Sequence, residues 1–451
     1  MATAKKTAAK KPAKKGAKAA KKPAKKTPKK TAKKPAKKAS KKKQAPKLSV
    51  KAQVRLVQEQ IQTATKGSAR LTLGKDYVLP YLTLRRPTGL LSLDIALAGG
   101  FAAGGPSQII GKPSSGKTWL AFHSMAEVQR YYGDGFAGAV ALTENRFDKL
   151  WVKSPSIGVR TALSENEIYE LETVRKRNDP EFTGFSPEEL DFFRDQVGAG
   201  VSEIVADTAE NLYEAVLRAV AANVFQVIIV DSLGAMLPAL EAEGTMEDDT
   251  YAGASSVNTK FMHKYQAIMN RLDADGRSNE TTLLFINQYR VNVGGSRFAF
   301  GPRQEMSEQG GWSIKHHNMA NLYMESGSIE HEDEIIKEFR DARSKMIHWN
   351  VIKQKAGGHE GAKGKFVFDF GTGADVLADM TLMGVLHGVV QKKGSWYSLL
   401  GPSQDPDDPL IKGQGLPAFK EELVQMPNLQ GYLRAEVMKA AGMGDRRYGP
   451  L

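Results

Sequence analysis

The segment GKPSSGKT has residue types and spacing that bind phosphate groups. It matches the pattern G-x-x-x-x-G-K-[ST], in which glycines let backbone N–H groups converge on phosphate oxygens without obstruction by side chains. Lys117 is expected to neutralise the β- and γ-phosphates, and the Thr118 hydroxyl to bind Mg²⁺. The segment therefore predicts a site for ATP and Mg²⁺. Its residues are Gly111, Lys112, Pro113, Ser114, Ser115, Gly116, Lys117 and Thr118.

Three apolar runs elsewhere in the chain end in polar residues that suit the same chemistry. The runs are VALTE (Val140–Glu144), QVIIVDS (Gln226–Ser232) and LLFINQ (Leu283–Gln288). Continuous apolar runs are typical of parallel strands buried on both faces, and ligands gather where such strands end. We therefore expect Glu144, Asp231 and Gln288 to converge on the phosphate loop. Asp231 is expected to be the second protein contact of Mg²⁺.

The elements that must position these residues are those of an α/β fold. The phosphate loop follows an apolar run, Gln108–Ile110, and precedes a stretch with helical spacing, Trp119–Tyr131, which is the strand–loop–helix context that the motif requires. Upstream, Val50–Thr63 has apolar residues at helical spacing and predicts an amphipathic helix.

A long segment, Tyr289–Gln309, combines glycine with arginine and phenylalanine. Glycine disfavours regular secondary structure, arginine suits phosphates, and aromatic rings stack on bases. We expect this loop to contact DNA. Its basic and aromatic residues are Arg290, Arg297, Phe298, Phe300 and Arg303.

The charge of the chain is concentrated at its N-terminus. Of the 64 basic residues, 21 are lysines in Met1–Lys47, which has no acidic residue, and the remaining 43 face 50 acidic residues. This Lys/Ala/Pro-rich segment is too polar to form a core and is expected to stay disordered. A mobile polycation binds DNA phosphates by releasing counterions. A solubilising tail or a targeting signal is the alternative explanation of the segment.

Composition also limits the class of protein. The chain has 451 residues and no cysteine, so disulfides and thiolate metal sites are excluded. No run of about 18 apolar residues is present, and a membrane span is not expected.

Taken in order, the motifs resemble those of the bacterial and phage RecA recombinase family. The similarity extends over roughly 50–433 and includes the apolar segment before the phosphate loop, the phosphate loop itself and the strands that end in polar residues. The further matching motifs are GLLSLDIALAGG (Gly89–Gly100), EAEGTMEDD (Glu241–Asp249), LLFINQYR (Leu283–Arg290), GGWSIK (Gly310–Lys315), VIKQKAGG (Val351–Gly358) and GQG (Gly413–Gly415).

The resemblance implies roles for individual residues. Glu144 would orient the attacking water, Gln288 would sense the γ-phosphate, and Asp148 would contact adenine. Lys353 and Lys355 would reach the ATP of a neighbouring subunit, and residues two apart on a strand do share one face. The two DNA-binding loops of the family would include Gly244 in the first, and Gly310 and Gly311 at the end of the second.

The resemblance also implies the domain organisation. We expect a disordered basic tail at 1–47, an oligomerisation segment at 48–82 and a RecA-like ATPase core with a mostly parallel sheet at 83–374. A small α+β C-terminal domain at 375–451 would follow. A charged segment, Ser164–Ser202, looks inserted and is expected to form surface helices.

The implied function is that of a DNA-dependent ATPase that forms helical filaments on single-stranded DNA, also binds double-stranded DNA and catalyses strand exchange. It would act in recombination, repair and the SOS response to DNA damage, in the cytoplasm and on the nucleoid, with possible single-strand-binding and loading proteins. Two alternatives are a hexameric motor for unwinding or branch migration, and a chiefly architectural DNA-coating protein.

Overall fold

A computed structural model describes the chain in separate stretches. They are residues 50–66, 83–143, 148–161, 165–179, 182–194, 200–233, 253–272, 277–291, 306–308, 311–331, 342–403, 405 and 407–449. Within these stretches no helix is both long and apolar enough to cross a membrane.

The chain divides into two compact units, Met1–Leu73 and Gly74–Leu451. The first contains helix α1 (Val50–Ala64), which coincides with the amphipathic helix predicted from the sequence. The helices of the second are α3 (Leu91–Ala96), α4 (Lys117–Tyr132), α5 (Lys149–Lys153), α6 (Glu165–Asn178), α7 (Pro187–Arg194), α8 (Ala209–Ala222), α10 (Gly253–Met269), α11 (Gly311–His317), α12 (Val376–Leu386), α13 (Gly415–Gln425), α14 (Pro427–Ala440) and the 3₁₀ turn η1 (Gly133–Gly135).

Strands of the second unit build one large sheet and two small ones. They are β1 (Arg85–Arg86), β2 (Phe101–Ala102), β3 (Pro106–Gly111), β4 (Ala137–Leu142), β5 (Gly200–Glu203), β6 (Val227–Asp231), β7 (Thr282–Val291), β8 (Met306–Glu308), β9 (Ala320–His331), β10 (Ala342–Gln354), β11 (Lys363–Asp369), β12 (Gly373–Ala374), β13 (Val390–Lys393), β14 (Trp396–Leu399) and β15 (Ile411–Gln414).

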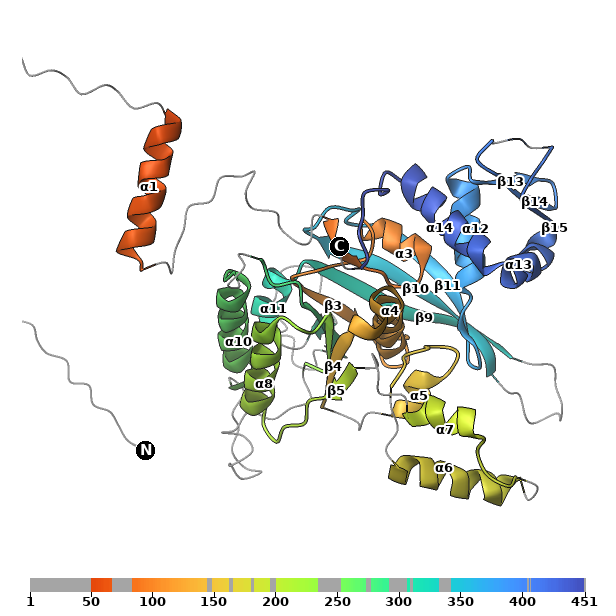
Figure 1. Ribbon diagram of the computed structural model, residues 1–451, viewed down its shortest axis with the longest axis horizontal. Helices are drawn as coiled ribbons and strands as arrows, with labels where there is room; N and C mark the ends of the chain where they lie inside the picture. Colours follow the sequence, from red (N-terminus) through yellow and green to blue (C-terminus); the bar gives the residue numbers. More distant parts are fainter. Residues whose placement is uncertain are drawn as a thin grey trace, which may run out of the picture. The chain divides into compact units, whose positions relative to one another are not determined.

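The large sheet has the order β12-β11-β10-β9-β3-β7-β6-β4-β5, with β8 paired to β7. Strands β9, β3, β7, β6, β4 and β5 are mutually parallel, whereas β10, β11 and β12 continue the sheet in antiparallel fashion. Helices lie on both sides of it (Figure 1). The predicted α/β class with a mostly parallel central sheet is confirmed.

Alternate residues of the central strands enter two different cores, as strands covered on both faces require. In β6, Val227 and Ile229 join a core that includes α4, and Ile228 and Val230 join a core that includes α8 and α10. The apolar runs of the sequence are continuous for this reason. Both faces of the sheet are covered, so the ends of the strands are where a ligand can reach it.

The C-terminal part has its own three-stranded sheet, β13-β14-β15, and a third core formed with α12, α13 and α14. Leu91 of α3 also belongs to this core, so the C-terminal elements pack against the segment that precedes the phosphate loop. The segment expected to be an insertion contains α6 and α7, which contact each other. Tyr169 and Val174 of α6 are exposed.

Candidate nucleotide-binding site

The phosphate loop joins the end of β3 to the start of α4. Gly116, which caps α4, has φ 83°, a left-handed conformation that a glycine adopts without strain. A Cβ on Gly111 would lie 2.1 Å from the carbonyl oxygen of Met324, so the close approach of β9 requires glycine there. Lys117 is 7% exposed, and its Nζ donates to the carbonyl oxygen of Lys112 at 2.7 Å. The loop is therefore held closed by the lysine that is expected to bind phosphate.

Thr118 and Asp231 meet although 113 residues separate them in the sequence. The Thr118 hydroxyl donates to Oδ2 of Asp231 at 2.8 Å. The end of β6 is fixed in turn by Thr143, whose backbone N–H donates to the Asp231 carbonyl oxygen at 2.7 Å and whose hydroxyl accepts from the Ser232 N–H at 2.9 Å.

The Thr118 hydroxyl and the Asp231 carboxylate are the residues expected to hold Mg²⁺. A hydroxyl and a carboxylate are the hard oxygen ligands that Mg²⁺ prefers, and Mg²⁺ usually keeps several waters and uses few protein ligands. In the part of the chain that the structure describes, no cluster of three or more His, Cys, Asp or Glu forms a site held by the protein alone. Thr118 and Asp231 therefore fit an ion that is shared with a nucleotide.

The strand register brings the predicted strand ends to one edge of the sheet. Gly111 pairs with Gln288 of β7 on one side and with Met324 of β9 on the other. Asp231 pairs with Leu142 of β4 and lies next to β7. Gln288 is not the last residue of its strand, since β7 continues to Val291. Glu144 lies outside the described residues, two positions beyond the end of β4.

Lys353 and Lys355 lie at the opposite edge of the sheet. Lys353 pairs with Asn321, which pairs with Gln108 of β3. Gln108 precedes Gly111 by three residues, or about 10 Å of strand. The lysine pair is thus directed away from the phosphate loop of its own chain.

Both lysines contact the C-terminal end of α11. Lys353 Nζ donates to the carbonyl oxygens of Lys315 at 2.5 Å and His316 at 2.8 Å, and Lys355 Nζ donates to that of His316 at 2.6 Å. Partial burial, and then repulsion by Lys355, lower the pKa of Lys353 to about 8. The two ammonium groups share one face, as their spacing predicts.

Asp148 stands at the start of α5. Its Oδ1 accepts from the backbone N–H of Trp151 at 3.0 Å, which is the contact of a helix cap. The side chain is exposed. A role toward adenine therefore stays a prediction.

The segment expected to be an irregular DNA-binding loop begins and ends in a β-ladder, so the prediction of an irregular loop throughout Tyr289–Gln309 is wrong. Arg290 of β7 pairs with Ser307 of β8, and Val291 pairs with Met306. Regular pairing brings the two ends of the segment together, a long-range contact that glycine content does not reveal. Gly311 is the first residue of α11, so part of GGWSIK is helical. The other predicted DNA contacts lie outside the described residues; they are Gly244, Arg297, Phe298, Phe300, Arg303 and Gly310.

One residue beside the phosphate loop was missed by the sequence reasoning. Lys345 of β10 donates from Nζ to the carbonyl oxygen of Ser114 at 2.6 Å. Its sequence signal is weak but real: Lys345 alternates with the apolar residues Ile347, Trp349 and Val351, so it occupies a buried position of the strand.

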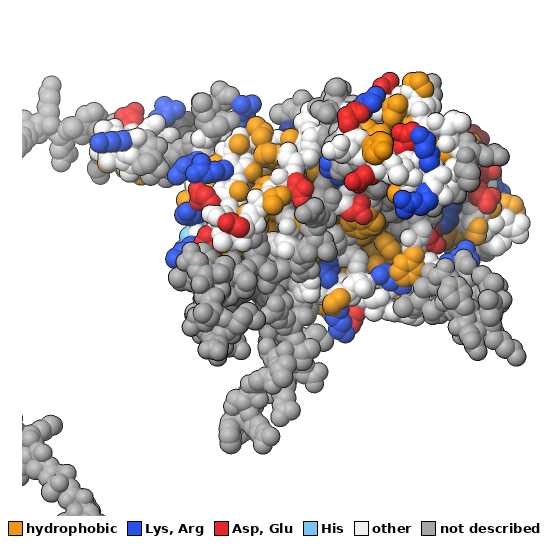
Figure 2. All heavy atoms as spheres, turned by 90° about the horizontal axis from the view of Figure 1, so that it is seen from below, with side chains coloured by type: hydrophobic (Ala, Val, Ile, Leu, Met, Phe, Trp, Pro, Cys, Tyr) orange, Lys and Arg blue, Asp and Glu red, His pale blue; other side chains and the backbone are white. Residues whose placement is uncertain are grey.

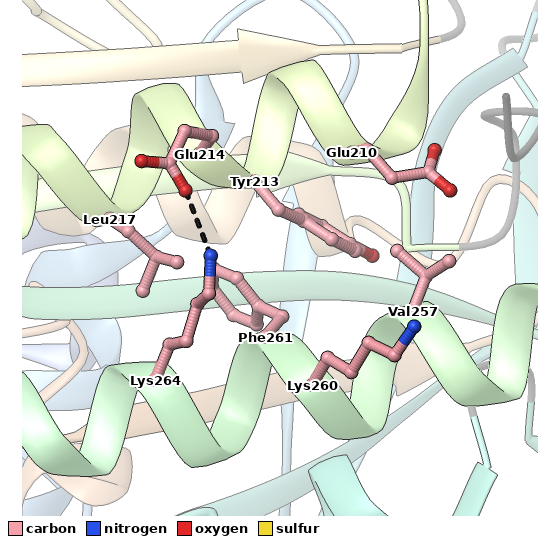
Figure 3. A pocket seen from close by; sticks show the side chains of 8 residues that line it. All are labelled: Glu210, Tyr213, Glu214, Leu217, Val257, Lys260, Phe261 and Lys264. Carbon is pink, nitrogen blue, oxygen red and sulfur yellow. Dashed lines mark hydrogen bonds and ion pairs between the residues drawn. The ribbon is translucent and has the colours of Figure 1, made fainter.

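A groove also runs between α8 and α10 (Figure 3). An ion pair crosses it from Glu214 Oε2 to Lys264 Nζ at 3.1 Å. Phe261 and Leu217 form its apolar floor, which belongs to the core on that side of the sheet. The groove contains none of the predicted nucleotide contacts.

Charges are mixed on one face of the molecule. On the face shown in Figure 2, lysine and arginine side chains alternate with aspartate and glutamate and form no single basic patch. This agrees with the near balance of charge outside Met1–Lys47.

Comparison with known proteins adds independent information. The family model of the RecA N-terminal domain matches residues 193–363, which include Asp231, Gln288, Lys353 and Lys355. The chain is 27% identical over 356 residues to Protein RecA of Thermus aquaticus, covering 79% of this chain and 85% of that protein. It is 27% identical over 396 residues to Protein RecA of Acidothermus cellulolyticus, covering 87% and 93%.

Protein RecA of Thermotoga maritima is 24% identical over 382 residues, covering 84% of this chain and 88% of that protein. A solved structure, the crystal structure of the RadB recombinase, is similar with a TM-score of 0.36 at 18% identity, covering 64% of this chain and 98% of that chain. The family match and the similarity to these RecA proteins over most of the chain, together with the phosphate loop at the edge of a mostly parallel sheet, support a protein of the RecA family.

Proposed function

We propose that this protein is a recombinase of DNA repair. It binds ATP and Mg²⁺, assembles as a helical filament on single-stranded DNA, hydrolyses ATP when DNA is bound, and pairs and exchanges homologous strands. Relatives named RecA support the recombination function. Action in the cytoplasm, on nucleoid DNA and with loading proteins belongs to the same proposal.

The observation that carries the proposal is the contact of Thr118 with Asp231 beside the phosphate loop. Phosphoryl transfer needs little from a protein except positioning and neutralisation of charge. Lys117 would neutralise the β- and γ-phosphates once it leaves the Lys112 carbonyl oxygen, and Thr118 and Asp231 would hold Mg²⁺. The chemistry that Mg²⁺ would supply there is neutralisation of phosphate charge. Gln288, beside Gly111, would contact the γ-phosphate, and Glu144 would orient the attacking water.

The lysine pair supports an assembly in which one chain completes the ATP site of the next. Lys353 and Lys355 lie at the sheet edge remote from their own phosphate loop. Cations supplied by a neighbouring subunit can accelerate phosphoryl transfer by about 10³–10⁵. Hydrolysis would therefore depend on filament assembly.

The same lysines link this chemistry to DNA. They bind the end of α11, the helix that follows the β7–β8 ladder and the segment proposed to contact DNA. If that segment changes conformation when it binds DNA, the carbonyl oxygens that the lysines contact would change position. This physical connection supports DNA-dependent hydrolysis.

We further propose that α1, within 48–82, is the oligomerisation helix. Leu56 and Val57 are exposed apolar side chains on it, at 47% and 43%. Residues 83–374 would form the ATPase core, with its DNA loops, and 375–451 the C-terminal domain.

The test combines ATPase rates, with and without single-stranded DNA, and electron microscopy of the protein with ATP and DNA. We expect stimulated hydrolysis and open helical filaments. Lys117→Ala should remove hydrolysis and ATP-dependent strand exchange. Lys365→Ala, at an exposed position of β11, is the matched control and should keep both.

Two outcomes would contradict the proposal. Closed rings that translocate along DNA would indicate a motor instead. Strand exchange by Lys117→Ala without ATP would mean that the nucleotide site is not used and that the protein acts by coating DNA.

A further inference from the structure

Lys345 lies in an environment that is unusual for a lysine. It is 8% exposed and reaches from β10 to the phosphate loop, where Nζ contacts the Ser114 carbonyl oxygen at 2.6 Å. The rings of Phe368 and Phe370 lie 5.4 and 5.3 Å from the ammonium group. The ammonium group thus lies beside two aromatic rings and one carbonyl oxygen of the loop.

No acid compensates this charge among the described residues. Loss of water lowers the pKa of Lys345, and no carboxylate acts in the opposite direction. A buried cation without a counter-ion is costly, and an anion brought next to it regains part of that cost. The adjacent loop is the part of the chain expected to receive an anion with several charges.

Lys345 also holds the most strained part of the loop. Ser114 has φ 58°, in the left-handed region that non-glycine residues seldom adopt. The carbonyl of this residue is the one that Lys345 binds, while Lys117 binds the carbonyl of Lys112. Two residues further along β10, Ile347 packs near Gly116. A Cβ added to Gly116 would lie 2.8 Å from Cδ1 of Ile347. One strand therefore supports the loop at both Ser114 and Gly116.

We propose that Lys345 is a positioning residue for the phosphate loop of its own subunit and that its charge raises the affinity for nucleotide phosphates. This inference rests on the proposed ATP site. It gives β10 two separate functions. Lys345 serves the nucleotide site of the same chain, whereas Lys353, at the other end of the strand, and Lys355, just beyond it, serve that of the next.

The experiment measures the dissociation constant of the full-length chain for a fluorescent N-methylanthraniloyl-ADP with Mg²⁺. Lys345→Met removes donor and charge but keeps most of the side-chain length, Lys345→Gln keeps a donor without charge, and Lys345→Arg keeps both. Loss of a charged hydrogen bond predicts an increase of roughly tenfold to a hundredfold for Lys345→Met. Lys345→Gln should be intermediate, and Lys345→Arg nearest to the unmodified chain. Lys365→Met, which removes one exposed charge from the adjacent strand, should change the constant less than about twofold.

If Lys345 had a purely structural role, the dissociation constants of the variants would not follow this order. Circular dichroism and a thermal melt check each variant for folding, and if Lys345→Met does not fold, the comparison of Lys345→Gln with Lys345→Arg decides. Higher salt should reduce the difference between those two, because the charge term is screened. For ATP hydrolysis by Lys345→Met, we also expect KM to increase by a larger factor than the factor by which kcat decreases.

The inference is overturned if Lys345→Met binds within about twofold of the unmodified chain while Lys117→Ala has lost binding. It is likewise overturned if Lys345→Arg binds no better than Lys345→Met. Failure of the unmodified chain to bind the probe at all would instead overturn the proposed ATP site.

Discussion

At the scale of single residues, two lysines of β10 illustrate how surroundings set the chemistry of a side chain. Lys345 and Lys353 are both partly removed from water, and each donates to backbone carbonyl oxygens. Only Lys353 has a second ammonium group beside it, that of Lys355, and its pKa falls to about 8. Its charge therefore changes within an accessible pH range.

This lowered pKa predicts a pH dependence of DNA-stimulated hydrolysis. Lys353 is charged below about pH 8 and loses its proton above it, so the rate should fall as the pH rises through this value. Rates measured from pH 6.5 to 9.5 at constant ionic strength test this. In Lys353→Arg the fall should move to higher pH, because guanidinium stays charged. If the pH dependence of the rate is unchanged in Lys353→Arg, then the titration of Lys353 does not cause the fall.

His123 of α4 gives a second prediction at this scale. It is 6% exposed, stacks on Trp119 with ring centroids 4.6 Å apart, and burial lowers its pKa to about 4. The unfolded chain takes up this proton near pH 6.5, so stability is lost as the pH falls from there toward 4. The shift corresponds to about 3 kcal/mol of unfolding free energy.

Urea unfolding at pH 7.5 and pH 5 measures this effect. The decrease between the two pH values should be smaller in His123→Gln, in which nothing titrates at that position. The exposed His348 provides the control, since His348→Gln should keep the full decrease. An equal decrease in all three chains would exclude His123 as its source.

At the scale of elements, the β7–β8 ladder begins next to Gln288 and leads along the chain to the segment proposed to bind DNA. Val291 and Met306 are paired neighbours in this ladder. A two-residue Asn-Gly turn can join such a pair. Replacing residues 292–305 by Asn-Gly should therefore keep the hairpin and the affinity for the fluorescent ADP. Stimulation of hydrolysis by single-stranded DNA should be lost, and retained stimulation would place DNA contact elsewhere.

A buried ion pair connects α3 with α14. Arg434 Nη2 donates to Asp94 Oδ2 at 2.6 Å, and the backbone N–H and hydroxyl of Thr88 each donate to Asp94 Oδ1 at 2.7 Å. Asp94 is fully buried, and burial raises the pKa of its carboxyl group although Arg434 opposes this. The carboxylate is thus stabilised by two donors of the nearby Thr88 and one of Arg434, which is 340 residues away in the sequence.

Removing one partner should be strongly destabilising, because the other charge stays buried. We expect Arg434→Met to lower the unfolding free energy by about 3–5 kcal/mol. Lys439→Met, which removes an exposed partner of Glu436 on the same helix, should cost less than about 1 kcal/mol. Thermal and urea unfolding measure the loss of unfolding free energy in the two variants. Similar losses in Arg434→Met and Lys439→Met would contradict the importance of burial.

At the scale of the whole molecule, charge is divided between a basic tail and a mildly acidic remainder. The 21 lysines of Met1–Lys47, which lies outside the described residues, account for the positive net charge of +14. Binding of such a segment to DNA depends on counterion release and hence on salt.

Replacing Met1–Lys47 by a Gly/Ser segment of equal length should weaken binding to double-stranded DNA and flatten its dependence on salt. The slope of log K against log salt concentration, measured by fluorescence anisotropy, reports this change. DNA-stimulated hydrolysis should be largely kept, since the phosphate loop is untouched. If hydrolysis is lost with duplex binding, the tail has a role in assembly as well.

The sequence by itself determined the class of fold, and it contained the phosphate-loop motif and the motifs that resemble the RecA family. Eight consecutive residues carry the loop motif, and strands buried on both faces read as continuous apolar runs, as in β6 and β7. The amphipathic pattern of α1 likewise depends only on local spacing. These features are encoded within short stretches of chain.

Only the tertiary structure decided which distant residues meet. It paired Thr118 with Asp231, brought Lys345 to Ser114, directed Lys353 and Lys355 to α11, and made a ladder of β7 and β8. The sequence predicted that Thr118 and Asp231 share a site, but the contacts themselves depend on strand order and register. Those are set by how the whole sheet buries both of its faces, which no single segment specifies.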